Sequence, residues 1–117
     1  MYNFVYLIGR LTQDPEISIT DNGKKVLPVI LAVQRTYKNA EGIYEADFIK
    51  CTLWDSIAER ACEYCHKGDL IGIRGQIKNT SYTNEENEKK YNTEVMVERL
   101  CFLSTTQLEE ESKKFKK

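Results

Sequence analysis

Two groups of residues in this sequence have types and spacings that could do chemistry, and the first is the segment Cys62–His66, CEYCH. The spacing C-x-x-C-H is typical of covalent haem attachment, and C-x-x-C also occurs in redox and zinc sites. A structural zinc site normally takes four ligands in close pairs, so Cys51 and Cys101, far away in strand-like runs, would have to complete it. The N-terminal residues show no secretory signal. We therefore expect four reduced thiols and no haem, metal or other cofactor.

The same segment has a simpler explanation in a helix predicted over residues 56–68. Small and apolar side chains recur there on one stripe, which consists of Ile57, Ala58, Ala61, Cys62 and Cys65. Free cysteine behaves as a small hydrophobe, so both thiols are expected to pack against the rest of the domain. The residues expected to face water are Glu59, Arg60, Glu63 and His66. Adjacent residues on a helix do not face each other, so Cys65 and His66 are not expected to form a catalytic dyad.

The second group alternates aromatic and basic residues along the predicted strand 47–55, DFIKCTLWD. Successive side chains of a strand point to opposite faces. The face expected to meet the core carries Ile49, Cys51 and Leu53. The other face carries Phe48, Lys50, Thr52 and Trp54. Two large rings on either side of a cation, away from the core, are not typical of a merely solvated surface.

The predicted strand 69–82 repeats this arrangement. Its expected core face carries Ile71, Ile73, Gly75 and Ile77. Its outer face carries Arg74, Gln76, Lys78, Thr80 and Tyr82. The end of an earlier strand adds Arg35, Tyr37 and Lys38 to the same chemical class.

Rings interleaved with cations suit an unpaired nucleic-acid strand. Bases stack on the rings, at roughly 1–3 kcal/mol each, while the cations follow the phosphates, and no hydrogen-bonding code is needed. Exposed aromatic side chains also mark subunit interfaces, or they can lie under a chain terminus. From the residues alone these interpretations remain open.

The elements that must position these residues are mostly strands. Strands are predicted over 3–12, 16–20, 25–37, 47–55, 69–82 and 91–103, with one helix between the third and fourth long strands. Pro28 cannot donate a ladder hydrogen bond, so it is expected at an edge or a bulge. Ser56 and Glu59 have capping-box spacing at the start of the helix. Long strands with a single helix at this place predict an all-β domain that closes into a small barrel.

The composition bounds the function without naming it. The chain has 117 residues, 41% hydrophobic and 30% charged, which suits one globular domain. The net charge of −1 gives no sign of a nucleic-acid partner, so any such binding would depend on local segregation of Lys and Arg. We find no run of about 20 apolar residues that could cross a membrane and no catalytic motif. We therefore expect a protein that is not an enzyme.

Several segments of the chain, taken in order, resemble the bacterial single-stranded DNA-binding proteins over roughly residues 2–103. The matching segments are LIGRLTQDPE, LAVQRTY, ADFIKCTLWDSIAE, KGDLIGIRGQIKNTSY and YNTEVMVE, in the family's order and spacing. The resemblance implies an oligonucleotide/oligosaccharide-binding (OB) domain over 1–104, a five-stranded Greek-key barrel with one helix between strands 3 and 4. It also implies sequence-tolerant binding of single-stranded DNA in replication, recombination and repair, usually as a homotetramer in the cytoplasm at the nucleoid, with a dimer as the other possibility.

The resemblance also assigns roles to particular residues. The stacking rings correspond to Tyr37, Phe48, Trp54 and Tyr82. The cations that contact the DNA backbone correspond to Lys50, Lys67 and Lys78, with Arg10, Arg35, Lys38 and Arg74 as further candidates. The family has no catalytic residue and no metal or cofactor at the positions of Cys62, Cys65 and His66.

The chain departs from the family at its end, because EEESKKFKK replaces the acidic tail and hydrophobic tip by which many relatives recruit replication and repair enzymes. We expect residues 105–117 to form a short, flexible charged tail, and those enzyme partners are not implied. The alternative function is a primosome-type OB-fold adaptor that mainly holds protein partners. A redox or haem protein built on Cys62 and Cys65 is the alternative from another class.

Overall fold

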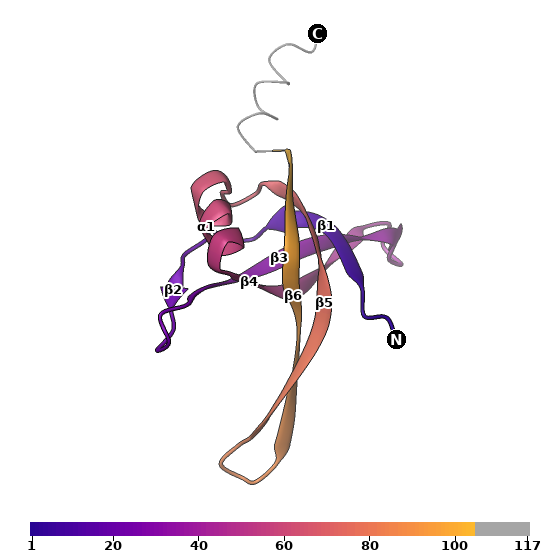
Figure 1. Cartoon of the computed structure of the whole chain (residues 1–117). Helices are drawn as coiled ribbons and strands as arrows, with labels where there is room; N and C mark the ends of the chain where they lie inside the picture. The colour runs from indigo at the N-terminus through magenta and orange to yellow at the C-terminus, as the bar shows by residue number, and fades with distance from the viewer. Residues whose placement is uncertain (105–117) are drawn as a thin grey trace.

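The computed structural model describes residues 1–104, and the charged tail predicted at 105–117 lies outside the described residues. Figure 1 shows a fold made mostly of strands, and within residues 1–104 there is one helix. The strands are β1 (Val5–Leu11), β2 (Ser18–Ile19), β3 (Lys25–Lys38), β4 (Tyr44–Trp54), β5 (Leu70–Thr83) and β6 (Lys89–Ser104), and the helix is α1 (Asp55–Tyr64). Among the described residues, no helix is long and apolar enough to cross a membrane.

The strands close into a barrel. Their order is β1-β5-β6-β4-β3-β2, and a further antiparallel pairing of β1 with β3 joins the two ends of the sheet. The pairing of β4 with β6 is parallel and short, and the other pairings are antiparallel. Apart from the two-residue β2, five long strands are present, with α1 between the third and the fourth. The prediction of a five-stranded all-β barrel with one inserted helix is confirmed.

The core fills the closed part of the barrel with alternate side chains of the strands. Its most deeply buried large side chains are Leu27, Leu31, Leu53 and Ile73. The helix covers one end of this core, where Ala58, Ala61 and Cys65 are buried and Ile57 and Cys62 are partly buried against it. This is the stripe that the sequence predicts. Burial raises the pKa of the Cys51 thiol to about 12 and that of Cys65 to about 11, which keeps both protonated at neutral pH.

The burial expected for two residues is wrong, each for a local reason. Thr52, predicted on the outer face, is buried, because it lies between Pro28 of β3 and Met96 of β6 and is a short side chain. Ile77, predicted in the core, is 48% exposed. The pairing of β5 with β1 ends at Gly75, so Ile77 lies beyond the closed barrel and has no opposite wall to pack against.

The predicted capping box is also wrong. The helix begins at Asp55, with Trp54 as its N-cap residue and no side-chain hydrogen bond at the cap, so Ser56 already lies inside the first turn. The chain turns directly from β4 into α1 at Asp55, whose φ of 51° lies in the left-handed region that Asp tolerates better than most residues. This abrupt junction fixes the backbone of Trp54.

Glycine and proline mark two special places in the barrel wall. A Cβ atom at Gly75 would collide with the Met96 carbonyl, so the close approach at the bulge between β5 and β6 requires glycine. Pro28 lies on the stretch of β3 between its pairing with β2 at Val26 and its pairing with β1 at Leu31. On that side the stretch has no partner strand among the described pairings, which confirms the expectation of an edge position.

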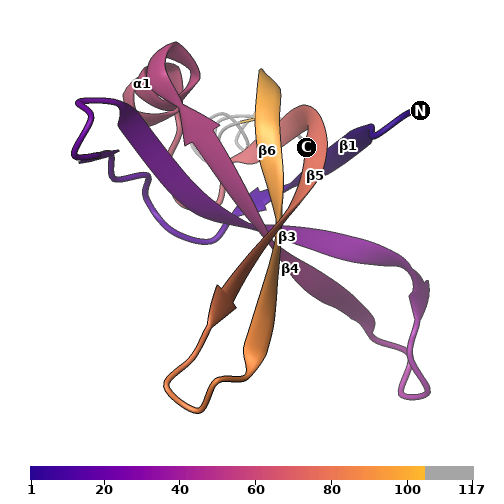
Figure 2. The ribbon, with the colours of Figure 1, turned by 60° about the horizontal axis from the view of Figure 1, so that its bottom comes forward.

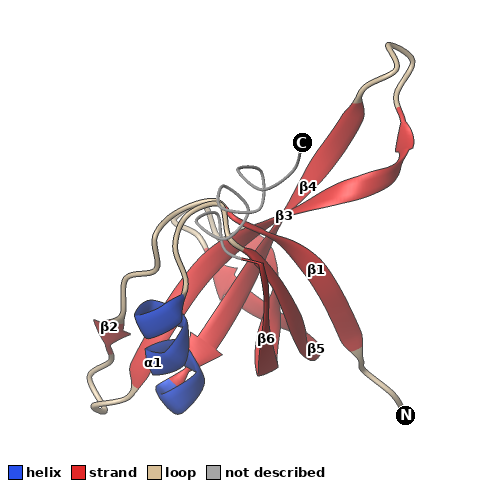
Figure 3. Cartoon of the chain, turned by 90° about the horizontal axis from the view of Figure 1, so that it is seen from above, coloured by secondary structure: helices blue, strands red, loops and turns tan. Residues whose placement is uncertain are grey.

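Two hairpins extend beyond the closed barrel. Figure 2 shows the β3–β4 and β5–β6 hairpins leaving the barrel in different directions. In Figure 3, α1 and β2 lie at the end of the molecule opposite the tip of the β3–β4 hairpin. The exposed outer strand faces and these hairpins carry most of the residues of the predicted site.

Candidate nucleic-acid interface

Three of the four predicted stacking rings are open to solvent. Tyr37 is 63% exposed, Phe48 is 70% exposed and Tyr82 is 56% exposed. A ring exposed to this degree contributes little to the core, so its removal is not expected to unfold the barrel. Tyr37 lies on the β3–β4 hairpin and Tyr82 on the β5–β6 hairpin. Phe48 lies between them on β4, on the outer surface that β4 forms with β6 and β5, which we call the wall.

The fourth ring, Trp54, is held differently. It is half-buried at the end of β4, opposite Val26 of β3, and it is also the N-cap residue of α1. Asp55 accepts a hydrogen bond from the backbone N–H of Lys25, which ties the β4–α1 junction to β3. Trp54 is therefore the least exposed of the four rings, and its backbone is held between β3 and α1.

The wall between the hairpins brings cations from two strands close together. Lys50 on β4 and Lys78 on β5 flank Glu94 of β6, because Glu94 is the direct ladder partner of Lys78 and forms an ion pair with Lys50. Phe48 lies two residues from Lys50 on the same face of β4. The structure thus gathers one predicted stacking ring and two predicted phosphate-binding cations on one wall.

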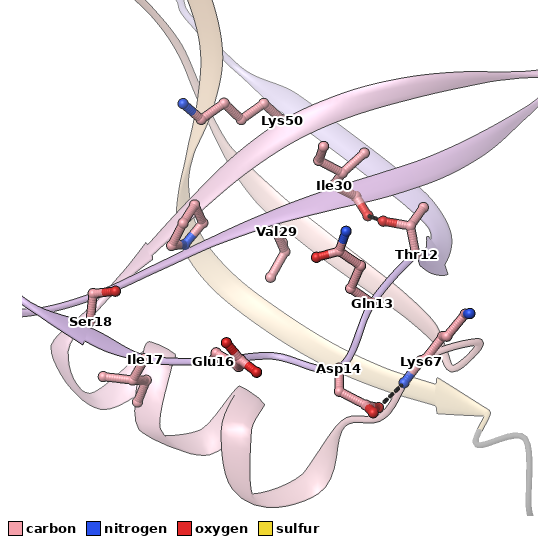
Figure 4. A pocket seen from close by; sticks show the side chains of 11 residues that line it. Thr12, Gln13, Asp14, Glu16, Ile17, Ser18, Val29, Ile30, Lys50 and Lys67 are labelled. Carbon is pink, nitrogen blue, oxygen red and sulfur yellow. Dashed lines mark hydrogen bonds between the residues drawn. The ribbon is translucent and has the colours of Figure 1, made fainter.

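A groove of about 680 Å³ opens beside this wall, along the stretch of β3 that has no partner strand on the side away from β4. Figure 4 shows Lys50 and Lys67 reaching it from different sides, with Gln13 between them. The segment that carries Lys67 is held in place by two contacts. Asp14 accepts the backbone N–H of Lys67 at 2.8 Å, and Arg10 donates to the Gly68 carbonyl at 2.9 Å. Arg10 therefore supports the loop of Lys67 from β1.

The β3–β4 hairpin holds its cations near carboxylates and an aromatic ring. The Arg35 guanidinium donates to Asp47 and Glu45, with shortest distances of 2.8 and 2.9 Å. The hydrogen bond from Arg35 lowers the pKa of Asp47 and correspondingly raises that of Arg35. The Lys38 Nζ lies 5.5 Å from the centre of the Tyr44 ring, within range of a cation–π contact.

The β5–β6 hairpin places a basic residue directly opposite its predicted ring. Tyr82 and Lys90 are ladder partners and so share one face of the hairpin. Lys90 also forms an ion pair with Glu88 at 3.2 Å. The sequence prediction missed Lys90 and Tyr44 as candidate members of the interface. Folding each hairpin back on its tight turn would have aligned Lys90 with Tyr82 and Tyr44 with Lys38.

Arg74 is the predicted residue that the structure sets apart from the groove. It lines a separate shallow hollow of about 240 Å³, together with Tyr6, Gly72, Arg99 and Cys101. The remaining predicted cations lie around the groove, on the wall or on the β3–β4 hairpin. The roles of all eleven predicted residues in binding stay predictions.

The segment Cys62–His66 makes local contacts at the end of the helix. Within the described part of the chain, no cluster of three or more His, Cys, Asp or Glu side chains could hold a metal ion, and the cysteines are unpaired. The Cys62 Sγ lies 3.6 Å from the Pro15 carbonyl, and the His66 backbone N–H donates to the Asp69 carboxylate at 2.8 Å. These contacts tie the end of the helix to adjacent loops.

Comparison with known proteins connects this geometry to a family. The sequence model described as "Single-strand binding protein family" matches residues 2–103. Single-stranded DNA-binding protein B of Bacillus subtilis is 48% identical over 103 residues, which cover 88% of this chain and 91% of that protein. The single-stranded DNA-binding protein of Halalkalibacterium halodurans is 47% identical over 103 residues, covering 88% of this chain and 61% of that protein.

A third relative, single-stranded DNA-binding protein A of Bacillus subtilis, is 43% identical over 103 residues, 88% of this chain and 60% of that protein. The chain therefore spans nearly all of one relative and about three fifths of the other two. In each case the match has the length of the barrel described above.

Proposed function

The chain belongs to the single-strand binding protein family, and from that premise we propose that it binds single-stranded DNA with little regard to sequence. The observation that carries the proposal is the outward exposure of Tyr37, Phe48 and Tyr82 beside lysines and arginines of neighbouring strands. Bases stack on such rings whatever their identity, because every base has a flat π-face, while the cations neutralise the phosphates.

The proposed path uses the surfaces described above. Trp54 and Phe48 of β4 provide rings on the barrel, and Lys50, Lys78 and Lys67 lie beside them or at the groove. Tyr37 and Tyr82 extend the path onto the hairpins. Such a surface acts by mass action, since binding the unpaired strand shifts DNA away from hairpins and shields it from nucleases.

The biological setting follows as part of the same proposal. The family is a DNA-binding one that carries out no catalytic reaction, and we assign this chain to the protection of exposed strands in replication, recombination and repair, in the cytoplasm at the nucleoid. We also propose self-association, as a homotetramer or a dimer. Its support is a set of exposed apolar side chains on β1, on the residue that precedes it and on β6, namely Tyr6, Ile8, Phe4, Phe102 and Leu103. Sedimentation would measure the assembly size.

A protein adaptor of the same fold is the less favoured function. An adaptor surface needs apolar contact area but has no need of cations between the rings. The chain places Lys50 two residues from Phe48 and Lys90 opposite Tyr82, which matches a polyanion better than a protein partner.

Fluorescence of the single tryptophan tests the proposed function directly. Titration with oligo-dT should quench the emission of Trp54, because a base stacks on its half-buried ring, and the affinity should fall as salt rises. A duplex of the same length is the control and should compete poorly. Unchanged emission together with no binding by filter retention at low salt would rule the proposal out.

A further inference from the structure

One carboxylate lies in the middle of the proposed phosphate-binding wall. Glu94 of β6 is the ladder partner of Lys78 on β5, so the two side chains share a face of the sheet. On its other side β6 runs parallel to β4, and the Glu94 carboxylate lies 3.7 Å from the Lys50 Nζ. Three strands thus converge to place one negative charge between two cations of the interface.

The setting of Glu94 differs from that of the other acidic residues near the interface. Its side chain is only 19% exposed, whereas the Asp47 and Glu45 side chains that contact Arg35 are 51% and 49% exposed. Exposed charges are readily screened by salt and can swing away, but a partly buried charge is screened much less. The charge of Glu94 is therefore screened less by salt than the charges of Asp47 and Glu45.

We propose that Glu94 is a built-in counter-ion that limits the affinity of the wall for DNA. Before DNA binds, Glu94 neutralises Lys50 and shares a face with Lys78. A phosphate that approaches Lys50 must break this ion pair and then lies close to the remaining carboxylate. The gain from the phosphate contact is reduced by both effects, so the DNA leaves this wall more easily than two lysines would otherwise allow. This inference rests on the proposed function.

The consequence is measurable in the salt dependence of binding. Each phosphate neutralised on a single strand contributes about −0.7 to the slope of log K against log salt. Replacing Glu94 with the isosteric amide, Glu94→Gln, frees one cation. The variant should bind oligo-dT several-fold more tightly at low salt, and its slope should steepen by about 0.7. Because of the steeper slope, raising the salt from about 50 to 200 mM should lower the affinity of the variant by roughly threefold more than it lowers that of the unmodified protein.

A matched control separates this effect from a change in net charge. Glu63 is exposed on α1, outside the residues proposed to bind DNA, and Glu63→Gln changes the net charge by the same amount. It should leave both the affinity and the slope as in the unmodified protein. Equal effects of the two substitutions would contradict the proposal, because the whole-molecule charge would then explain the gain.

A double-mutant cycle tests the ion pair itself. Lys50→Gln should cost more affinity in the Glu94→Gln background than in the unmodified protein, because only the unmodified protein must break the Lys50–Glu94 pair on binding. Additive effects of the two substitutions would overturn the inference. Thermal unfolding must confirm that each variant is folded. If Glu94→Gln does not fold, Glu94→Asp, which shortens the side chain by one methylene, takes its place. This variant should show an intermediate gain in affinity, and an unchanged affinity would also overturn the inference.

The two proposals fail in distinguishable ways. If the unmodified protein does not bind oligo-dT at low salt, the proposed function is wrong. If it binds, but Glu94→Gln leaves both the affinity and the slope unchanged, only the role of Glu94 is wrong.

Discussion

The closed barrel and the two hairpins are built from the same strands but follow different rules. In β5, side chains of Ile71 and Ile73 are buried, whereas every residue from Ile77 to Thr83 is exposed. β3 behaves alike, because alternate side chains are buried in its first half and the end toward Lys38 is exposed. Alternation along a strand buries side chains only where a second wall of the barrel faces them. In the hairpins, beyond the closed part of the barrel, the same alternation separates two faces that are both exposed to solvent.

The difference assigns separate tasks to the two regions. The barrel holds the core and fixes Trp54 at the β4–α1 junction. The hairpins have few buried contacts, which is typical of segments that open or move at low cost in free energy. A rigid wall with two extended arms can follow a flexible strand of DNA more closely than a barrel alone.

The largest expected effect is on the free energy of unfolding, and it is tested by replacing one side chain in the barrel and one in a hairpin. Leu53→Ala should lower the free energy of unfolding by about 2–5 kcal/mol, because it leaves a cavity in the barrel. Ile77→Ala, on the hairpin side of the closure, should change it by less than about 0.5 kcal/mol. Urea denaturation measures both. Similar losses for the two variants would show that the hairpins share the core.

The next effect is on DNA binding. Phe48→Ala on the barrel and Tyr82→Ala on its hairpin should each weaken binding to oligo-dT by roughly 1–3 kcal/mol and leave the melting temperature nearly unchanged. Tyr64→Ala is the control, since Tyr64 is an equally exposed ring on α1 that packs against Phe102. If Tyr64→Ala weakens binding as much as the others, the proposed path is misplaced. If Phe48→Ala matters and Tyr82→Ala does not, the DNA stays on the barrel.

The smallest effect, at pH 9, concerns the thiols of the core. Burial raises the pKa of Cys51 to about 12 and that of Cys65 to about 11 from an ordinary value of 9.0, so above pH 9 the unfolded chain loses protons that the folded chain keeps. Stability should therefore fall as pH rises. The loss should be under about 1 kcal/mol at pH 9 for the two thiols together, growing by up to about 1.4 kcal/mol per pH unit for each.

Chemical denaturation between pH 7 and 10 measures this slope, and the matched control uses the same proteins. Replacing both buried thiols, Cys51→Ala with Cys65→Ala, should flatten most of the alkaline loss and leave the contribution of Cys62, whose thiol pKa is also raised by burial. Cys101→Ser, at an exposed position, should keep the full slope. An unaltered slope in the double variant would show that these thiols do not titrate between the two states.

The sequence predicted the barrel because its strands carry strong local signals. Branched and aromatic residues alternate over the long strands, and the small-residue stripe of α1 identified its buried face before any contact was known. The errors for Thr52 and Ile77 have different causes, and only the error for Ile77 concerns the closure of the barrel. A strand pattern shows which residues share a face, but where the barrel closes depends on pairings such as β1 with β5, whose partners are about 70 residues apart.

The same limit explains what was missed at the interface. The resemblance to a family pointed to rings and cations one position at a time, and it gave no information on the carboxylates that face them. The contacts of Lys50 with Glu94 and of Arg35 with Asp47 join different strands, so they follow from register and not from composition. Lys90 was overlooked for the same reason, since it joins the surface only through its pairing with Tyr82.

Pro28 has a consequence for how copies of this chain meet. The stretch of β3 between its pairings with β2 and β1 is an open backbone edge, a shape that can template the addition of a foreign strand and lead to aggregation. Proline has no amide hydrogen to offer an intruding strand, so the ladder is interrupted in the middle of this stretch. The addition of a strand from another copy of this chain is thereby discouraged at this stretch.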